Sequence, residues 1–548
     1  MPILNWITKD KDLQTAAKTE YRLLNEISEL GYGDKSTENM LIEGDNLEAL
    51  KALLPFYAGQ VKCIYIDPPY NTGAAFEHYD DNLEHSQWLA MMYPRLELLR
   101  ELLAEDGSIY VQIDNAEQPY LKVIMDEIFH RRNFVQMVSV KRASPAGFKV
   151  INPGPLTVTE YILLYAKNKE KLSYYPQRIP VKYDKNYDLY IKNLNASPEL
   201  WELCKLTDLL YERWGISTWQ EAKQKYGENW KIIREAALGD LALELKDSVV
   251  SVRDPHKPSE QIKRVLNMSQ EQRNKVFIIP RENYSPIYIY NGGSLSFYKE
   301  KLREIEGVLT PTELLTDFWA DINYAGIAQE GKTQFKNSKK PEMLVRRVID
   351  LATKEGDLIL DSFLGSGTTA AVAQKMGRCY IGIEMGEHAK THCAERLKKV
   401  IEGEQGGISK SLKWNGGGGF RYYILGETVF DSEGKINPNI KFPNLAAHIW
   451  FSETKTPWNN PAKKTASTVL GIHNGVAYAL LYNGILGDRT VNGGNVLTSK
   501  TLEIIKQDLQ GQDYESIVIY GEYSRLGTER LKSENIEFKQ TPYDIKKR

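Results

Sequence analysis

Short apolar segments alternate with helical segments in two stretches of this chain, and this alternation constrains the fold more than any other feature. Apolar segments with strand character lie at residues 39–42, 61–66, 108–113, 358–361 and 379–384. Segments with helical periodicity lie at residues 47–54, 87–103, 118–129, 341–353 and 368–376. Strands that alternate with helices form a parallel sheet covered on both faces. We therefore predict an α/β fold with a doubly wound sheet.

Three further stretches flank or interrupt this pattern. Residues 1–40 are charged and are expected to form an N-terminal helical arm. Residues 141–326 break the alternation and are rich in aromatic and basic side chains, so we expect an inserted domain, with residues 156–167 as a candidate strand of the main sheet. A glycine-rich linker precedes residues 410–548, which are expected to form a smaller C-terminal domain. The main domain then comprises residues 41–140 and 327–402.

Composition excludes several classes of protein. No apolar run approaches the length of a membrane span, and the N-terminus lacks a signal-peptide pattern, so a cytoplasmic location is expected. The four cysteines are far apart and form no Cys-x-x-Cys pair, which predicts neither a zinc site nor a disulfide framework. A formal net charge of -2 leaves nucleic acid open as a partner, because only a local basic surface is required.

The first candidate site is Asp67-Pro68-Pro69-Tyr70, directly after the expected strand at residues 61–66. The amino nitrogen of a nucleic-acid base is a poor nucleophile because its lone pair is delocalised into the ring. Acceptors on that amine, from the carboxylate of Asp67 and the carbonyl of Pro68, favour an attacking geometry. The two prolines hold the turn rigid, and Tyr70 offers a ring for stacking on a base taken out of a duplex. A simple strand-ending turn is the alternative interpretation.

The second candidate site begins at Asp361 and reads Asp-Ser-Phe-Leu-Gly-Ser-Gly-Thr-Thr. Gly365 and Gly367 let a ligand approach the backbone closely, and the N–H groups at the helix start, near Thr368, suit a carboxylate. Glu384 ends the next strand, where an acidic side chain suits two ribose hydroxyls. The segment matches neither a dinucleotide nor a P-loop fingerprint. A tight turn is again the alternative.

Together, the two sites resemble those of the amino-group DNA methyltransferases, in which Asp-Pro-Pro-Tyr is the catalytic motif and Phe-x-Gly-x-Gly the cofactor motif. Here the catalytic motif comes first and a long segment precedes the cofactor motif, an order that resembles the β class. The likeness to modification subunits of type III restriction–modification systems includes residues 41–46, 67–73, 84–89, 92–96 and 340–342. It covers about residues 40–170 and 315–400. Ser362 departs from the pattern, which usually has proline there.

The resemblance implies a fold and an activity. The fold would be a Rossmann-like S-adenosylmethionine-dependent methyltransferase sheet, with residues 141–326 as the inserted target-recognition domain. The activity would be transfer of a methyl group from S-adenosyl-L-methionine to adenine N6 in double-stranded DNA by base flipping. Aspartate in the first motif position favours adenine, since serine is commoner there in cytosine-N4 enzymes. No metal is required.

The resemblance also implies roles for individual residues. The catalytic residues would be Asp67, Pro68, Pro69 and Tyr70. The cofactor pocket would include Asp45, Lys340, Asp361, Phe363, Gly365, Gly367, Thr368 and Glu384. Asp45 would accept from the cofactor adenine amine, with helix capping as the alternative, and Lys340 would line the methionine pocket, with a helix start as the alternative. Asn71 and Thr72 would bind the flipped nucleotide or only complete the turn.

Other functions remain open. Cytosine-N4 methylation is the nearest alternative, and RNA and protein-glutamine methylation use related motifs. A non-catalytic DNA-recognition subunit is the alternative from another class, although the intact catalytic motif argues against it. The sequence contains no helicase-type P-loop and no obvious nuclease motif, so restriction would need a separate helicase–nuclease subunit. The domain at residues 410–548 is then a candidate for homodimerisation or for docking that partner.

Overall fold

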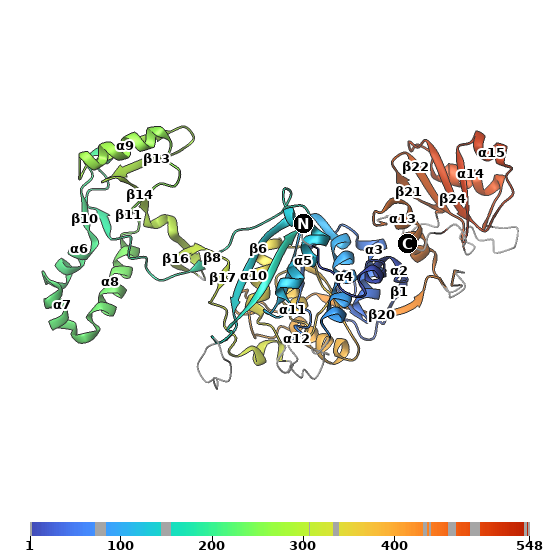
Figure 1. Ribbon diagram of the computed structural model, residues 1–548, viewed down its shortest axis with the longest axis horizontal. Helices are drawn as coiled ribbons and strands as arrows, with labels where there is room; N and C mark the ends of the chain where they lie inside the picture. Colours follow the sequence, from blue (N-terminus) through green and yellow to red (C-terminus); the bar gives the residue numbers. More distant parts are fainter. Residues whose placement is uncertain are drawn as a thin grey trace. The chain divides into compact units, whose positions relative to one another are not determined.

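The chain folds into two compact units, shown in Figure 1. The computed structural model describes residues 3–71, 84–143, 155–305, 307–332, 339–430, 436–437, 440–458, 467–482, 494–541 and 545. One unit comprises Pro176–Leu315, and the other comprises Met1–Tyr175 together with Thr316–Arg548. The larger unit carries both candidate motifs.

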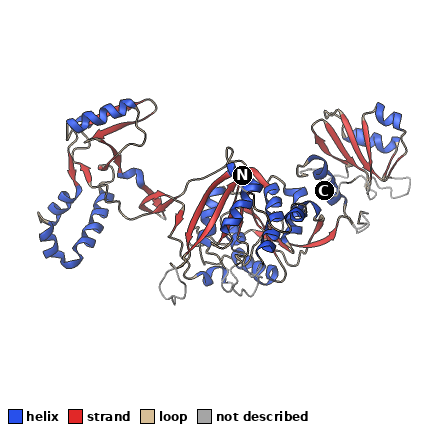
Figure 2. Ribbon diagram, in the orientation of Figure 1, coloured by secondary structure: helices blue, strands red, loops and turns tan. Residues whose placement is uncertain are grey.

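Parallel strands form the centre of the larger unit (Figure 2). In spatial order they are β3 (Met40–Glu43), β19 (Cys379–Glu384), β18 (Leu358–Asp361), β4 (Val61–Ile66) and β5 (Leu103–Ile113). Their residues are mostly buried, so helices must cover both faces of the sheet. One group of helices is α3 (Asn46–Tyr57), α4 (His85–Leu102) and α5 (Gln118–Phe129); the other is α10 (Glu342–Ala352), α11 (Thr368–Lys375) and α12 (Glu395–Ile401). The predicted doubly wound α/β fold is confirmed.

The topological switch point of this sheet lies between β4 and β18. The chain continues from β4 to β5 on one side and from β18 to β19 on the other. In the shared register, Ile359 lies opposite Cys63 and Leu360 opposite Ile64. Ligands of open α/β sheets bind beyond the carboxyl ends of the strands at such a point. The two candidate motifs follow β4 and β18 directly, so strand pairing brings them to the same edge.

The chain on either side of the inserted unit belongs to the central sheet. β7 (Thr159–Ala166) lies antiparallel between β5 and β6 (Phe134–Lys141), and β17 (Phe318–Trp319) pairs with β6. The compact inserted unit is therefore shorter than the stretch expected from the sequence, residues 141–326. β7 corresponds to the candidate strand expected at residues 156–167, whereas β17 lies in a stretch that was expected to belong to the inserted domain.

The N-terminal segment differs from the expected helical arm. α1 (Lys9–Asp12) and α2 (Thr15–Lys18) are single turns, and they are followed by β1 (Arg22–Glu26) and β2 (Tyr32–Gly33). Both strands pair antiparallel with β20 (Gly419–Thr428), which lies parallel to β3. The helical expectation for residues 1–40 was thus wrong for much of the segment, because pairing with a distant strand outweighs its weak local preferences.

The smaller unit has its own sheets and helices. Its six-stranded sheet runs β10 (Leu203–Lys205), β9 (Leu189–Ile191), β11 (Val249–Arg253), β14 (Gly293–Phe297), β13 (Tyr284–Tyr290) and β12 (Val276–Arg281). A three-stranded sheet runs β15 (Leu302–Ile305), β16 (Val308–Leu314) and β8 (Arg178–Pro180). The helices are α6 (Leu206–Trp214), α7 (Trp219–Tyr226), α8 (Trp230–Glu244) and α9 (Glu260–Glu271). Several aromatic residues that mark this stretch, such as Tyr187 and Tyr298, form its core, whereas Trp219 is 51% exposed.

The end of the chain forms a further α/β layer within the larger unit. Its sheet runs β21 (Val469–His473), β22 (Val476–Leu480), β24 (Ser516–Gly521) and β26 (Ile536–Gln540), accompanied by α13 (Phe442–Thr454), α14 (Ser499–Asp508) and α15 (Thr528–Ser533). Trp458 follows α13 and donates its backbone N–H to the carbonyl of Pro55 in α3 at 2.9 Å. This layer begins after β20, and so later than the expected boundary at residue 410. In the described part of the chain, no helix is long and apolar enough to cross a membrane.

Candidate active site

The carboxylate of Asp67 lies at the centre of the site that follows β4. Its Oδ2 is 3.0 Å from the ammonium nitrogen of Lys340. Its Oδ1 is buried and, among the described residues, has no hydrogen-bond partner. Buried polar atoms in folded proteins are nearly always bonded, so an unsatisfied oxygen at a strand end indicates where a ligand binds.

Tyr70 and Glu160 complete a buried network around Lys340. The ammonium donates to the hydroxyl of Tyr70 at 2.8 Å, and this hydroxyl donates to Oε2 of Glu160 at 3.1 Å. Oε2 of Glu160, on β7, also lies 3.6 Å from Nζ of Lys340. Glu160 accepts further hydrogen bonds from Arg142 at 2.7 Å and Gln112 at 2.5 Å. The hydroxyl end of Tyr70 is therefore fixed, which orients its ring.

The charges of this network follow from burial and from pairing. Burial raises the pKa of Asp67, although the ammonium of Lys340 acts in the opposite direction. Burial tends to lower the pKa of Lys340, but the carboxylates of Asp67 and Glu160 hold that pKa above its ordinary value. Burial likewise tends to raise the pKa of Glu160, and the cations of Lys340 and Arg142 hold it below its ordinary value. Lys340 is thus a cation and Glu160 an anion at neutral pH.

The turn after β4 is fixed by covalent geometry and by one tryptophan. Pro68 and Pro69 restrict φ on the two residues after Asp67. The indole N–H of Trp88, a fully buried residue of α4, donates to the carbonyl of Pro69 at 2.8 Å. The restricted φ angles of the two prolines and the hydrogen bond to Pro69 therefore hold the turn in one conformation.

Asn71 continues the turn in a left-handed conformation, with φ of +58°. Its amide donates to Oε1 of buried Glu117 at 2.8 Å, and Nδ1 of His85 lies 3.0 Å from the same oxygen. Asn71 thus has a bonding partner that holds the end of the motif. Thr72, which was expected beside it, lies outside the described residues.

Asp361 fixes the start of the glycine loop after β18. Its Oδ1 accepts from the backbone N–H of Phe363 at 2.9 Å, and its Oδ2 accepts from the hydroxyl of Thr369 at 2.6 Å. The side chain is almost completely buried, and burial raises the pKa of Asp361 to about 7. Both carboxylate oxygens therefore hold the shape of the loop.

The two glycines of the loop occupy conformations that favour glycine. Gly365 and Gly367 have φ of +58° and +78°. The N–H of Gly365 donates to Oε2 of Glu384, at the end of β19, at 2.6 Å. A Cβ on Gly367 would lie 3.3 Å from Cα of Cys393. Glu384 is thus bonded to the glycine loop, and both are expected to contact the same cofactor.

Lys340 connects the glycine loop to the carboxylate of Asp67. The hydroxyl of Thr368, at the start of α11, donates to the carbonyl of Lys340 at 3.4 Å and accepts from Arg396 at 2.7 Å. The side chain of Lys340 leads away from this contact towards Asp67. The backbone of Lys340 therefore borders the glycine loop, while its ammonium belongs to the network around Asp67.

Asp45 caps a helix. Its Oδ1 accepts from the backbone N–H groups of Leu47 and Glu48 at 2.9 and 3.3 Å, and its Oδ2 lies 3.0 Å from Arg95. This is the structural role weighed as the alternative for Asp45. The residue lies directly after β3, at the same edge of the sheet as Asp361 and Glu384.

The strand ends suit a nucleoside-type methyl donor. Glu384 offers an acidic side chain beside a glycine loop, and Ser362 has a buried hydroxyl without a hydrogen-bond partner among the described residues. An unsatisfied hydroxyl in the loop and an unsatisfied carboxylate oxygen on Asp67 therefore lie after neighbouring strands. Across the described ranges, no cluster of histidine, cysteine or acidic side chains could hold a metal ion.

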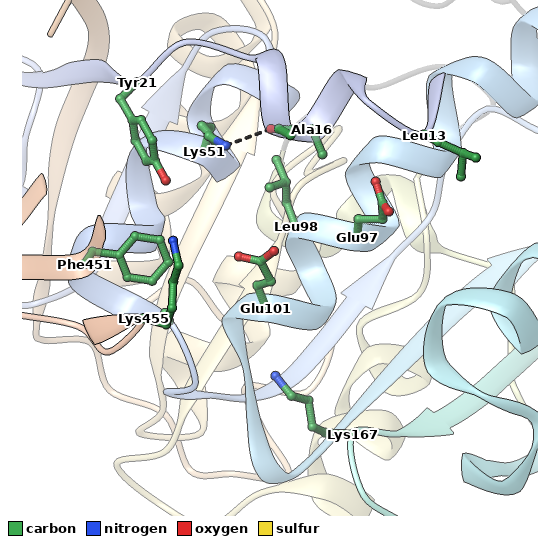
Figure 3. A pocket seen from close by; sticks show the side chains of 12 residues that line it. Leu13, Ala16, Tyr21, Lys51, Glu97, Leu98, Glu101, Lys167, Phe451 and Lys455 are labelled. Carbon is green, nitrogen blue, oxygen red and sulfur yellow. Dashed lines mark hydrogen bonds between the residues drawn. The ribbon is translucent and has the colours of Figure 1, made fainter. Parts of the chain in front are cut away.

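A separate pocket of about 460 Å³ lies away from these motifs (Figure 3). Side chains of α3, α4 and α13 line it, with Lys51, Glu97, Glu101 and Phe451 among them. The ammonium of Lys51 donates to the carbonyl of Ala16 at 2.8 Å. No residue of the catalytic or glycine motif lines this pocket, so it is not part of the candidate active site.

Sequence analysis missed Glu160, Gln112 and Arg396. None belongs to a recognised motif, and each reaches the site through strand pairing or helix packing of distant segments. One signal was available for Glu160: it is a lone carboxylate at the start of an otherwise apolar strand, β7. Acidic residues are rarely buried unless they are paired, so such a position indicates a partner.

The strand order, the switch point and the two loops above it define a Rossmann-like methyltransferase of the doubly wound α/β class. A family profile described as DNA methylase matches residues 61–395, more than half of the chain. The chain therefore belongs to the DNA methylase family.

Two sequence relatives agree with this assignment. The chain is similar to the probable type III restriction-modification enzyme HindVI Mod subunit of Haemophilus influenzae, with 39% identity over 71% of this chain and 54% of that protein. It is similar to the type III restriction-modification enzyme EcoPI Mod subunit of Escherichia phage P1, with 31% identity over 62% of this chain and 55% of that protein. The chain thus spans about half the length of these relatives. The solved complex of TTHA0409 from Thermus thermophilus with S-adenosyl-L-methionine has 14% identity over 70% of this chain and 99% of that chain, with a TM-score of 0.31.

Proposed function

We propose that this chain transfers a methyl group from S-adenosyl-L-methionine to the N6 amine of adenine in a specific site of double-stranded DNA. The observation that carries the proposal is the unsatisfied Oδ1 of Asp67, which lies buried at the end of β4, next to the loop after β18. An acceptor there suits an amine that must be made nucleophilic beside a methyl donor. Membership of the DNA methylase family supports the same conclusion.

In the proposed reaction, residues of the catalytic turn bind and orient the target base. Asp67 accepts from the exocyclic amine through Oδ1, and the carbonyl of Pro68 accepts from its second hydrogen. The ring of Tyr70, oriented by its bonded hydroxyl, stacks on the flipped base. Asn71 contacts the flipped nucleotide, with Thr72 following it. These contacts direct the lone pair of the amine towards the methyl group. They also fix the orientation in which the base approaches the methyl donor.

The loop after β18 orients the methyl donor in this proposal. Phe363, Gly365 and Gly367 border the cofactor, the first N–H groups of α11 at Thr368 face its carboxylate, and Glu384 binds its ribose hydroxyls. Asp45, Asp361 and the backbone of Lys340 complete the pocket. S-adenosyl-L-methionine supplies a methyl group activated by a sulfonium. The methylated amine is acidic enough to lose its proton without a strong base in the site.

The test is methylation of unmethylated genomic DNA by purified protein with labelled S-adenosyl-L-methionine, followed by sequencing for modified bases. Asp67→Ala and Asp67→Asn serve as catalytic controls, because both remove the carboxylate acceptor while the second keeps its shape. N6-methyladenine in one short sequence, absent with both variants, is the expected result.

Other outcomes would reject the proposal in distinct ways. N4-methylcytosine would keep the class and overturn the choice of base. Cofactor binding without methylation of any DNA would favour a targeting subunit or a substrate other than DNA. We place the reaction in the cytoplasm and, by the likeness to Mod subunits, within a restriction–modification system whose restriction subunit is a separate polypeptide.

A further inference from the structure

The two carboxylate oxygens of Asp67 have different surroundings. Oδ2 lies 3.0 Å from Nζ of Lys340, whereas Oδ1 is buried and has no hydrogen-bond partner among the described residues. The same ammonium donates to the hydroxyl of Tyr70 at 2.8 Å and lies 3.6 Å from Oε2 of Glu160. An ammonium has three donors, and three acceptors surround this one. Lys340 is therefore held in place on Oδ2.

Glu160 is the anchor of this arrangement. Its carboxylate is 3% exposed and accepts from Arg142 at 2.7 Å and from Gln112 at 2.5 Å. The amide of Gln112 accepts in turn from the hydroxyl of Tyr65 at 2.6 Å. The network thus runs through β4, β5 and β7, which are adjacent strands of one sheet. Side chains that are fixed on strands hold a site more exactly than side chains on loops.

We propose that Lys340, anchored by Glu160, is a positioning residue that occupies Oδ2 of Asp67 and leaves Oδ1 as the acceptor for the exocyclic amine of the target base. This inference rests on the proposed methyl transfer. A carboxylate held at one oxygen cannot rotate to present another lone pair, so the amine meets an acceptor that is already aligned. The charge of Lys340 also favours the ionised form of Asp67 in a buried site.

The pH dependence of Asp67 reports this contact directly. The titratable groups that face Asp67 among the described residues are Lys340, Glu160, Tyr65, Tyr70, Tyr324 and Asp361. Burial and Glu160 raise the pKa of Asp67, whereas the neighbouring Lys340 and Tyr70 lower it, and Lys340 is the cation among these groups. Loss of the lysine charge must therefore move the titration of Asp67 to higher pH.

The experiment compares wild-type protein with Lys340→Met, Lys340→Arg and Glu160→Gln. Single-turnover methylation is followed across pH, and S-adenosyl-L-methionine affinity is measured by calorimetry. We expect Lys340→Met to slow methylation by about 100-fold and to move the acidic limb of the profile upward by about one pH unit or more. Cofactor affinity should change by less than about threefold. Lys340→Arg should recover much of the rate, and Glu160→Gln should slow it by about 10-fold.

A chemically matched control lies in the C-terminal layer. Glu453 accepts from the hydroxyl of Tyr520 at 2.8 Å and from Lys539 at 3.0 Å, and Glu160 likewise accepts from a tyrosine hydroxyl and forms an ion pair with a lysine. Glu453→Gln removes the same kind of carboxylate on α13, outside the network that surrounds Asp67. We expect its methylation rate and its pH profile to match those of the wild type.

A second measurement separates this inference from the proposed function. With aspartate labelled by ¹³C at the carboxyl carbon, the Asp67 signal is assigned through Asp67→Asn and titrated without cofactor or DNA. A midpoint that rises in Lys340→Met supports the positioning contact even if no DNA is methylated, in which case only the proposed reaction fails. An unchanged midpoint with an unchanged methylation rate overturns the inference and leaves the reaction standing. Lost cofactor affinity as the sole effect would overturn it too, and would assign Lys340 to the cofactor pocket alone.

Discussion

Arg396 donates a hydrogen bond to the hydroxyl of Thr368 at 2.7 Å, while another nitrogen of its guanidinium donates to Oε1 of Glu342 at 2.8 Å. Glu342 also pairs with Lys375, and the side chains of all three charged residues are fully buried. The network joins α10, α11 and α12 behind the glycine loop. Removing one partner of such a network leaves a buried charge without compensation.

Arg396→Met should lower the free energy of unfolding by about 3–5 kcal/mol, because Glu342 loses one of its two cations. It should also weaken S-adenosyl-L-methionine binding, because Thr368 loses the donor that fixes the start of α11. Denaturant unfolding and calorimetry measure the two effects. Arg346→Met is the control on α10: Arg346 makes contacts with Asp350 at 3.4 Å and Ser411 at 2.7 Å, near the surface. Arg346→Met should lower the free energy of unfolding by less than about 1 kcal/mol. Equal stability of the two variants would contradict the prediction.

Gly367→Ala should combine backbone strain with crowding. A left-handed conformation costs a residue with a Cβ about 1–2 kcal/mol, and here the added carbon would lie 3.3 Å from Cα of Cys393. We expect a loss of stability and of cofactor affinity. Gly356→Ala is a matched control, since Gly356 has φ of +82° and a Cβ there would meet nothing within 4 Å. Gly356→Ala should lose only the part of the stability that backbone strain costs, with unchanged cofactor affinity; a parallel loss of affinity would show that the effect is not local to the loop.

Asp361 should make stability depend on pH. Burial raises its pKa in the folded protein from the ordinary value of 3.8 to about 7, so the native state binds this proton more tightly than the unfolded chain does. The free energy of unfolding should therefore fall as the pH rises between these two values. Asp361→Asn has no such proton, so the stability of the variant relative to the wild type should increase across that range. Urea unfolding at a series of pH values tests this, and parallel curves for the two proteins would refute it.

Truncation should show where the C-terminal layer begins. Deletion of residues 410–548 removes β20, which lies between β1 and β3 in the central sheet. We expect that chain to lose cooperative unfolding. A chain ending at Phe430 keeps β20 and should retain more of the helical signal and a sharper thermal transition. If both chains unfold alike, β20 is not required for the sheet. Gel filtration of the chain that ends at Phe430, beside the full chain, also tests whether the C-terminal layer carries a dimer contact.

The local sequence determined those elements whose signals are local. The strands at Val61–Ile66, Leu358–Asp361 and Cys379–Glu384 were predicted with their observed bounds, because short apolar runs there end at turn residues. The helix at Gln118–Phe129 was predicted equally well from its periodicity. The motif residues around Asp67 and Gly365 could also be found, since the chemistry of each motif lies within a few consecutive residues. Their proximity followed from the rule for parallel strands at a switch point.

Tertiary structure decided whatever depends on pairing between distant segments. β1 is a strand because β20 pairs with it, and no local feature of the N-terminal segment encodes that partner. Glu160 and Lys340 meet at Asp67 because β7 returns antiparallel to β5 while the segment before α10 crosses the end of β4. A sequence motif shows which side chains a turn contains, but not which distant residues surround them in the fold. Which oxygen of Asp67 is left for a substrate depends on charges that only the folded chain brings within 4 Å of it.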